Sequence, residues 1–183
     1  MKFLNLAATI SLLTLVHAVP VPNPIPSGPN VVAPTTISQY AVWTGAINFG
    51  TPWGKIFKNG QTSDMTTLVT FNFPAASAGE TCAFHFSLDN SATFTGSGLF
   101  DVFTSLAPAT ETTTSWPPGN QRNDQVARLQ AVVNEKATYV SGFPNSVQSF
   151  PCPSDTWAIE LVGVYDTDDI KWNGSISGPY VLF

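Results

Sequence analysis

Charged residues are scarce in this chain: Asp, Glu, Lys and Arg together make up 10% of its 183 residues, whereas about a quarter is usual. Basic residues are the scarcer kind, because 7 Lys and Arg stand against 12 Asp and Glu, for a net charge of −5 at pH 7. Nucleic acids and anionic membrane surfaces both attract clustered Lys and Arg. We therefore expect no nucleic-acid partner, and the acidity favours solubility.

Cysteine is scarce as well, with Cys82 and Cys152 the only two in the sequence. A structural zinc site normally takes three or four Cys or His ligands, and these cysteines lie far apart with one histidine, His85, near Cys82. No metal and no cofactor are expected. Free thiols, a shared metal ion and a disulfide remain the three options for the cysteines at this point.

Long apolar runs are missing beyond the N-terminus. After Lys2, residues 3–16 are almost wholly apolar, and V-H-A at residues 16–18 matches the pattern that a signal peptidase cuts. We expect a cleaved signal peptide over residues 1–18. A spanning helix needs about 20 apolar residues, so no stable membrane anchor is expected. Export leads to an oxidising compartment, where Cys82 and Cys152 most simply form one disulfide.

Strand-like patterns dominate the rest of the chain. Proline at nearly every second position predicts an extended, loosely ordered segment over residues 19–36. Strand-like runs then alternate with turn signals. They cover residues 37–43, 53–58, 64–73, 81–88, 93–106, 156–165, 170–172 and 179–183. With no convincing helix, they predict one all-β domain over residues 37–183, an antiparallel β-sandwich of roughly 8–10 short strands.

The clearest alternation lies at residues 81–88. Cys82, Phe84, Phe86 and Leu88 share one face of this strand, because successive side chains of a strand point to opposite sides. A disulfide at Cys82 would therefore lie in the apolar layer. Residues 126–133 are ambiguous, because their apolar positions fit both a helix stripe and a strand face.

Several blocks of the sequence together match the pattern of a known domain. They are W-G-K-I-F-K-N-G at 53–60, T-S-D-M-T-T-L-V-T-F at 62–71, Phe73-Pro74, Gly79, Cys82, Ser97-Gly98, G-F-P at 142–144, F-P-C-P at 150–153, Glu160-Leu161 and Gly178. With these blocks the chain resembles the fungal "But-two" C-terminal domain family, whose name describes binding to ubiquitin-activating enzyme three. The similarity covers about residues 40–183 and rests most on the two cysteine blocks.

The resemblance implies a secreted β-rich domain in which Cys152 pairs with Cys82, and a hairpin strand over residues 126–133 that turns at residues 134–136. It implies no catalytic residues. The partner in the family name works in the cytosol and nucleus, whereas an exported, disulfide-bonded chain lies outside the cell. The resemblance therefore does not carry that partner over to this chain.

Residues capable of catalysis are few and form no recognisable motif. His85 has no G-x-S-x-G nucleophile elbow to serve, so we interpret it as a half-exposed strand histidine. Paired carboxylates could hydrolyse glycosidic bonds, and the residues from Asp166 to Asp169 might hold calcium, although the sequence fails the EF-hand pattern. Our interpretation of the group after residue 160 is a solvated turn. The candidate carboxylates are Glu80, Asp101, Glu160, Asp166, Asp168 and Asp169.

Tryptophan is plentiful, with five in the chain. We expect Trp157 to pack in the core, and we name Trp116, Trp53 and Trp43 as candidate glycan-binding residues, because an exposed indole can stack on a sugar. Asn173, in N-G-S at residues 173–175, is a candidate N-glycosylation site on an exposed turn.

Taken together, these patterns predict a secreted, non-enzymatic fungal protein that associates with cell-wall polysaccharide or a host extracellular component, a class that includes secreted effectors. One alternative is a wall-directed glycan hydrolase that uses Asp or Glu. The other is the intracellular binding domain that the family name implies.

Overall fold

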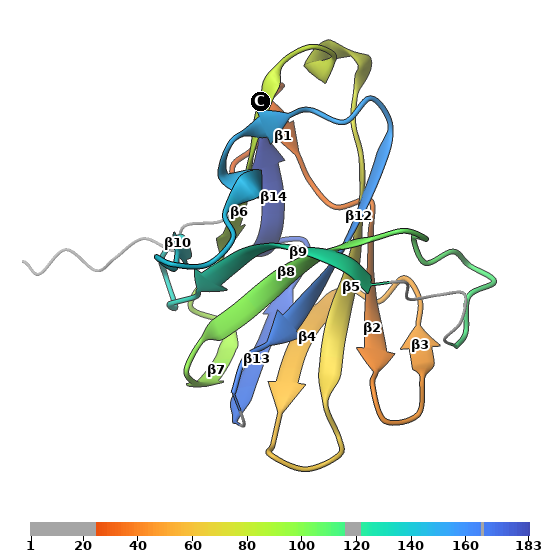
Figure 1. Ribbon diagram of the computed structural model, residues 1–183, viewed down its shortest axis with the longest axis vertical. Coiled ribbons are helices and arrows are strands. Elements are labelled where there is room, and N and C mark those ends of the chain that lie inside the picture. The colour runs from red at the N-terminus through yellow and green to blue at the C-terminus, as the bar shows by residue number, and fades with distance from the viewer. Residues whose placement is uncertain (1–24, 116–121, 166) are drawn as a thin grey trace, which may run out of the picture.

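The computed structural model describes residues 25–115, 122–165 and 167–183, and these residues form antiparallel strands and two short 3-10 turns (Figure 1). The strands are β1 (Val31–Val32), β2 (Thr36–Ala41), β3 (Ala46–Asn48), β4 (Trp53–Lys58), β5 (Met65–Asn72), β6 (Thr81–Ser87), β7 (Thr93–Gly96), β8 (Leu99–Ser105), β9 (Arg122–Gln130), β10 (Thr138–Tyr139), β11 (Phe150–Pro151), β12 (Thr156–Gly163), β13 (Asp168–Asn173) and β14 (Gly178–Leu182). The turns are η1 (Ala75–Ser77) and η2 (Ser146–Gln148). The predicted all-β class is confirmed. The strands outnumber the prediction partly because β1, β10 and β11 are only two residues long.

The strands belong to two sheets. Four of them form the smaller sheet, in the order β1-β14-β6-β11. The larger sheet runs β10-β9-β8-β12-β5-β4-β13-β7, and β2 pairs with both β5 and β3 beside this path. Figure 1 shows the larger sheet fanned out from β9 to β3, with β1, β14 and β6 upright beside it.

The core lies where the two sheets meet. Cys82, Phe84 and Phe86 of β6 all point into it and are 0% exposed, as their alternation predicts. The ring of Phe86 lies 4.8 Å from that of Phe100 on β8 and 5.1 Å from that of Trp172 on β13. One strand of the smaller sheet thus joins two strands of the larger. Each such buried side chain contributes about 1.5–3 kcal/mol through burial.

Trp172 is the tryptophan at the centre of the core, with 0% exposure. Its ring fits between Gly54 and Gly178, where an added β-carbon would overlap the indole. The two glycines are therefore needed for the close approach of the strands. Trp157, which the sequence placed in the core, is only partly buried, and it packs at the core margin with its ring 5.6 Å from that of Phe71.

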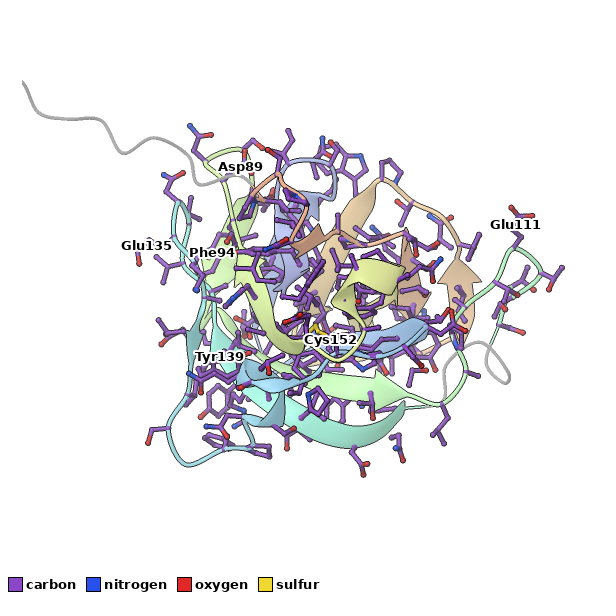
Figure 2. The ribbon with its side chains drawn as sticks, turned by 90° about the horizontal axis from the view of Figure 1, so that it is seen from above. Asp89, Phe94, Glu111, Glu135, Tyr139 and Cys152 are labelled. Atoms are coloured by element: carbon purple, nitrogen blue, oxygen red, sulfur yellow. A yellow bond between two sulfur atoms is a disulfide. The ribbon has the colours of Figure 1, made fainter. Side chains whose placement is uncertain are left out.

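A disulfide joins the two cysteine blocks. Cys82 and Cys152 are bonded with their Cα atoms 4.9 Å apart and 70 positions between them in sequence, and Figure 2 shows the yellow disulfide bond at the label of Cys152. Phe150 of β11 pairs directly with Cys82, and the N–H of Cys152 donates to the carbonyl of Glu80 at 3.0 Å. The predicted pairing is confirmed, and it fixes a proline-flanked segment onto the edge of β6.

A second, smaller core lies on the opposite face of the larger sheet. Tyr40, Ile47 and Leu68 are each less than a tenth exposed there, with Ala109 packed against them. They are covered by β3 and by the loop that follows β8. The N–H of Ile47 donates to the carbonyl of Thr114 at 2.9 Å, which holds that loop against β3, and Figure 2 shows Glu111 at its outer end.

Residues 126–133, which were ambiguous in sequence, belong mostly to a strand. They lie in β9 up to Gln130, and β10 returns beside it with Thr138 opposite Gln130. Asn134, in the connecting turn, has a φ of 64°, a left-handed conformation that asparagine tolerates better than most residues. The hairpin that the family resemblance implies is therefore present.

The predicted signal peptide, residues 1–18, lies outside the described residues. Of the proline-rich segment, the described part begins at Ile25, whose N–H donates to the carbonyl of Ile176 at 2.9 Å, and includes β1, which pairs with β14. No helix among the described residues has the length and apolar character needed to cross a bilayer.

Candidate functional site

An open groove of about 650 Å³ lies where three loops meet at one end of the larger sheet. The segment entering β2 forms one wall, the turn between β3 and β4 forms the second, and the turn between β13 and β14 forms the third. Hydroxyl, amide and small apolar groups line it together. The lining residues are Pro34, Thr35, Thr36, Ile37, Phe49, Gly50, Thr51, Pro52, Asn173, Gly174 and Ser175.

Local hydrogen bonds fix these loops. Gly50 has a φ of 67°, which favours glycine, and its N–H donates to the hydroxyl of Ser38 at 3.3 Å. The N–H of Gly174 donates to the carbonyl of Pro52 at 2.9 Å, so the second and third walls are joined directly. A β-carbon at Gly174 would overlap the side chain of Ile37, and the close approach to the first wall therefore also requires glycine.

Trp53 is not one of the lining residues, but it directly follows Pro52 of the second wall and so lies at the edge of the groove, with 40% of its surface exposed. It is the direct cross-strand partner of Asn173, so the two side chains lie on the same face of the sheet. The ammonium of Lys171 lies 4.9 Å from the centroid of the indole, and the carbonyl of Trp53 accepts a hydrogen bond from Gln39 at 2.9 Å. An exposed aromatic face beside hydroxyl and amide groups can bind a sugar, because the ring takes the apolar face and the polar groups take the hydroxyls.

The structure separates the tryptophans that the sequence grouped. Trp43 is 50% exposed, but it lies in the turn that follows β2. The last residue of β2, Ala41, is level with Met65, and Met65 is in turn paired with Phe57 near the far end of β4. Trp43 is therefore at the opposite end of β4 from Trp53. The third candidate, Trp116, lies outside the described residues.

Glu160 lies on β12, on the face opposite Ile159 and Leu161, and it is buried there. Its side chain is 0% exposed, and its carboxylate accepts two hydrogen bonds from the guanidinium of Arg122 at 2.7 and 2.9 Å. The hydroxyl of Thr66 donates a third at 2.6 Å. The hydrogen bond to Glu160 raises the pKa of Arg122, and the pKa of Tyr40 is raised by burial and by the same carboxylate. The pair is a structural tie beneath the second core.

The other predicted carboxylates are held separately. Asp101 accepts two hydrogen bonds from Arg128 at 2.6 and 2.8 Å. Asp168 is 1% exposed in β13 and accepts from the N–H of Gly98 at 3.0 Å, which corrects the interpretation of this group as a solvated turn. Asp169 lies 3.9 Å from Lys55. None of these contacts brings two carboxylates together in the way that glycoside hydrolysis needs.

Among the described residues, the remaining candidate carboxylates form neither a catalytic site nor a calcium site. Glu80 is exposed, with its backbone carbonyl bonded to Cys152, and Asp166 lies outside the described residues. The described part of the chain contains no group of three Cys, His, Asp or Glu residues that could hold a metal ion.

His85 occupies the outward face of β6, as the alternation predicts. Its ring is half-buried against that of Tyr180, with centroids 5.3 Å apart. Burial lowers the pKa of His85 to about 4, with a smaller contribution from the charge of Lys136. A base needs a nucleophile within hydrogen-bond reach, and no hydrogen bond joins this histidine to a described side chain. Its imidazole therefore serves packing.

Sequence reasoning missed the groove and both arginine–carboxylate pairs. The groove combines two loops at residues 34–37 and 49–52 with a third at residues 173–175, more than 100 positions further along the chain, and the only motif among them, N-G-S at 173–175, does not indicate a groove. Arg122 and Arg128 sit on one strand, where each also lies over an aromatic ring: Arg122 over Phe103 at 4.9 Å and Arg128 over Phe143 at 3.9 Å. The scarcity of basic residues was the only available signal, because a rare arginine in a strand usually has a specific partner.

Comparison with known families gives one match. The family model described as the ubiquitin 3 binding protein But2 C-terminal domain matches residues 34–177. That span contains both cysteines and every segment that lines the groove. No curated protein matches the chain.

Proposed function

We propose, from the premise that this chain belongs to the family of ubiquitin 3 binding protein But2 C-terminal domains, that it is an extracellular, non-enzymatic domain that binds polysaccharide. The groove beside Trp53 is the binding site, and its ligand is a wall glycan such as chitin or β-glucan, or a comparable glycan on a host surface. The observation that carries the proposal is the exposed indole of Trp53 at the edge of an open groove with hydroxyl and amide walls.

The disulfide supports the extracellular part of the proposal. Cys82 is fully buried, and its bond to Cys152 closes a 70-residue separation. Disulfides of this structural kind persist in oxidising compartments and are rare in the cytosol. A secreted protein is therefore the reading that the cross-link favours.

The placement of the carboxylates supports a binding role over hydrolysis. The groove lining contains no Asp or Glu. The hydrolase alternative relied on Glu160, which is buried and held by Arg122 and Thr66, so its oxygens do not face a substrate. Two well-placed carboxyl groups are what such chemistry requires.

The proposal is tested with the disulfide-bonded protein on insoluble chitin and β-glucan beads. We expect the wild type to be retained and Trp53→Ala to lose at least about ten-fold in affinity, which corresponds to about 1.4 kcal/mol. Trp43→Ala is the matched control, because Trp43 is equally exposed but lies at the other end of β4. A reducing-sugar assay on the same beads should show no turnover. An equal loss of affinity in Trp53→Ala and Trp43→Ala would contradict the assignment of the groove as the binding site.

The family description favours a protein-binding alternative. It predicts retention on beads that carry a ubiquitin-activating enzyme, in reducing buffer, by wild type and Trp53→Ala alike. The exposed side chains of Val42 and Trp43, after β2, would be the first surface to mutate in that case. Retention there without retention on glycan would replace the polysaccharide proposal.

A further inference from the structure

The candidate glycosylation site and the candidate sugar platform are neighbours in the fold. Asn173 is the last residue of β13, and its register partner across the sheet is Trp53, the first residue of β4. Side chains that are directly opposite in antiparallel strands have Cβ atoms about 4.5–5.5 Å apart and point to the same face. Any group attached to the Asn173 amide therefore starts within reach of the indole.

The amide of Asn173 is oriented with its nitrogen available. Its Oδ1 accepts hydrogen bonds from the N–H of Ser175 at 3.1 Å and from the Ser175 hydroxyl at 2.8 Å. Its Nδ2 donates to no other described residue. Ser175 and Ile176 are exposed beyond it, and Asn173 itself lines the groove. The structure thus leaves a clear path for a chain of sugars along the groove.

We propose that the first sugar of an N-glycan on Asn173 packs on the ring of Trp53, and that the attached glycan fills the groove and closes it to external polysaccharide. The closing part rests on the proposed function. In the modification, Nδ2 forms a bond to the anomeric carbon of an oligosaccharide carried on a lipid diphosphate. The bond from that carbon to the phosphate oxygen breaks, the lipid diphosphate leaves, and the amide loses one proton.

The groove and the ring can accept this sugar. A volume of about 650 Å³ lies within the range of small-molecule sites, about 300–1,000 Å³. The Trp53 ring is contacted by the Lys171 ammonium, but Lys171 is exposed and forms no ion pair with a described residue. Exposed cation–π contacts are weak, so the sugar can displace it. The fraction of molecules that carry a glycan on Asn173 then regulates the access of external polysaccharide to the groove.

The packing is tested by a thermodynamic cycle. Protein from a eukaryotic secretory host, trimmed to a single N-acetylglucosamine, is compared with unglycosylated protein from a bacterial periplasm, in the wild type and in Trp53→Leu. We expect the sugar to raise Tm by about 2–4 °C in the wild type and by less than half of that in Trp53→Leu. The sugar protons should also move upfield by ring current only when Trp53 is present. An equal Tm rise with no such shift, or an unmodified Asn173, would overturn the packing.

The closure is tested on β-glucan beads with the unglycosylated wild type and with wild type that carries its full, untrimmed N-glycan. We expect the unglycosylated form to be retained and the glycosylated form to bind at least about ten-fold more weakly, or about 1.4 kcal/mol. Equal retention of both forms overturns the closure and leaves the proposed function standing. If neither form is retained, the proposed function and the closure fail together, while the Tm cycle still decides the packing on its own.

Discussion

Reduction of the Cys82–Cys152 disulfide should destabilise this domain strongly. The bond closes a loop of about 70 residues, for which the chain-entropy estimate is about 4 kcal/mol at 25 °C. For a domain of this size, 1 kcal/mol moves Tm by about 2–4 °C, so Tm should fall by about 8–16 °C. The segment that carries Cys152 is otherwise held by the two-residue strand β11 and by the buried side chain of Val147.

The assay compares urea unfolding of the oxidised and fully reduced wild type, which avoids the cavity that a Cys→Ala variant would leave. Because Cys82 is 0% exposed, dilute reductant should act only at urea concentrations that already unfold the domain. The m-value should rise on reduction, because the unfolded chain is no longer cross-linked. A difference below about 1 kcal/mol would refute the reasoning, and it would mean that the sheets hold the Cys152 segment without the bond.

Three further changes test the core, the buried tie and the histidine. Gly54→Ala should destabilise the fold by about 1–3 kcal/mol, because its methyl group would meet the ring of Trp172. An unchanged Tm in thermal unfolding would contradict the close packing of Trp172 against Gly54. Glu160→Gln should destabilise the fold by about 1–3 kcal/mol, because the amide has one acceptor oxygen fewer for the hydrogen bonds from Arg122 and Thr66, yet leave glycan retention unchanged in the folded fraction; a loss of retention at full folding would place Glu160 in the site. The pKa of His85 in the folded protein is about 4, below its usual 6.5. Between these two pH values the unfolded chain therefore binds a proton at His85 that the folded protein does not bind. The free energy of unfolding should therefore fall as pH drops from about 6.5 to about 4, and denaturation of His85→Gln should show a flatter profile, whereas an unchanged slope would assign the effect to other groups.

The strands could be predicted from the sequence where apolar side chains recur at every second residue. At β6, apolar side chains recur at every second residue and one sheet face is buried, so the sequence alone identifies the buried set. The segment W-G-K-I-F-K matches β4 from Trp53 to Lys58, and the Asn59-Gly60 signal marks its end. β3 was missed, because three residues without a pattern become a strand only by pairing with β2.

The environment of Glu160 could not be read from its strand. Its neighbours Ile159 and Leu161 point to the main core, and the opposite face of an antiparallel sheet usually meets solvent. Glu160 is instead buried, and its carboxylate is held by Thr66 and by Arg122, which arrives from 38 positions away. The same limit applies to the groove, because the proximity of Asn173 and Trp53 depends on the register of β13 against β4.

The most direct test of the account is the affinity of the unglycosylated, disulfide-bonded protein for soluble β-glucan and chitin oligosaccharides, measured by titration calorimetry with Trp53→Ala and Trp43→Ala alongside. The account predicts saturable binding by the wild type and by Trp43→Ala, with a loss of at least about ten-fold in Trp53→Ala. Absence of heat with every oligosaccharide, or equal binding by Trp53→Ala, would contradict the assignment of the groove as a glycan site.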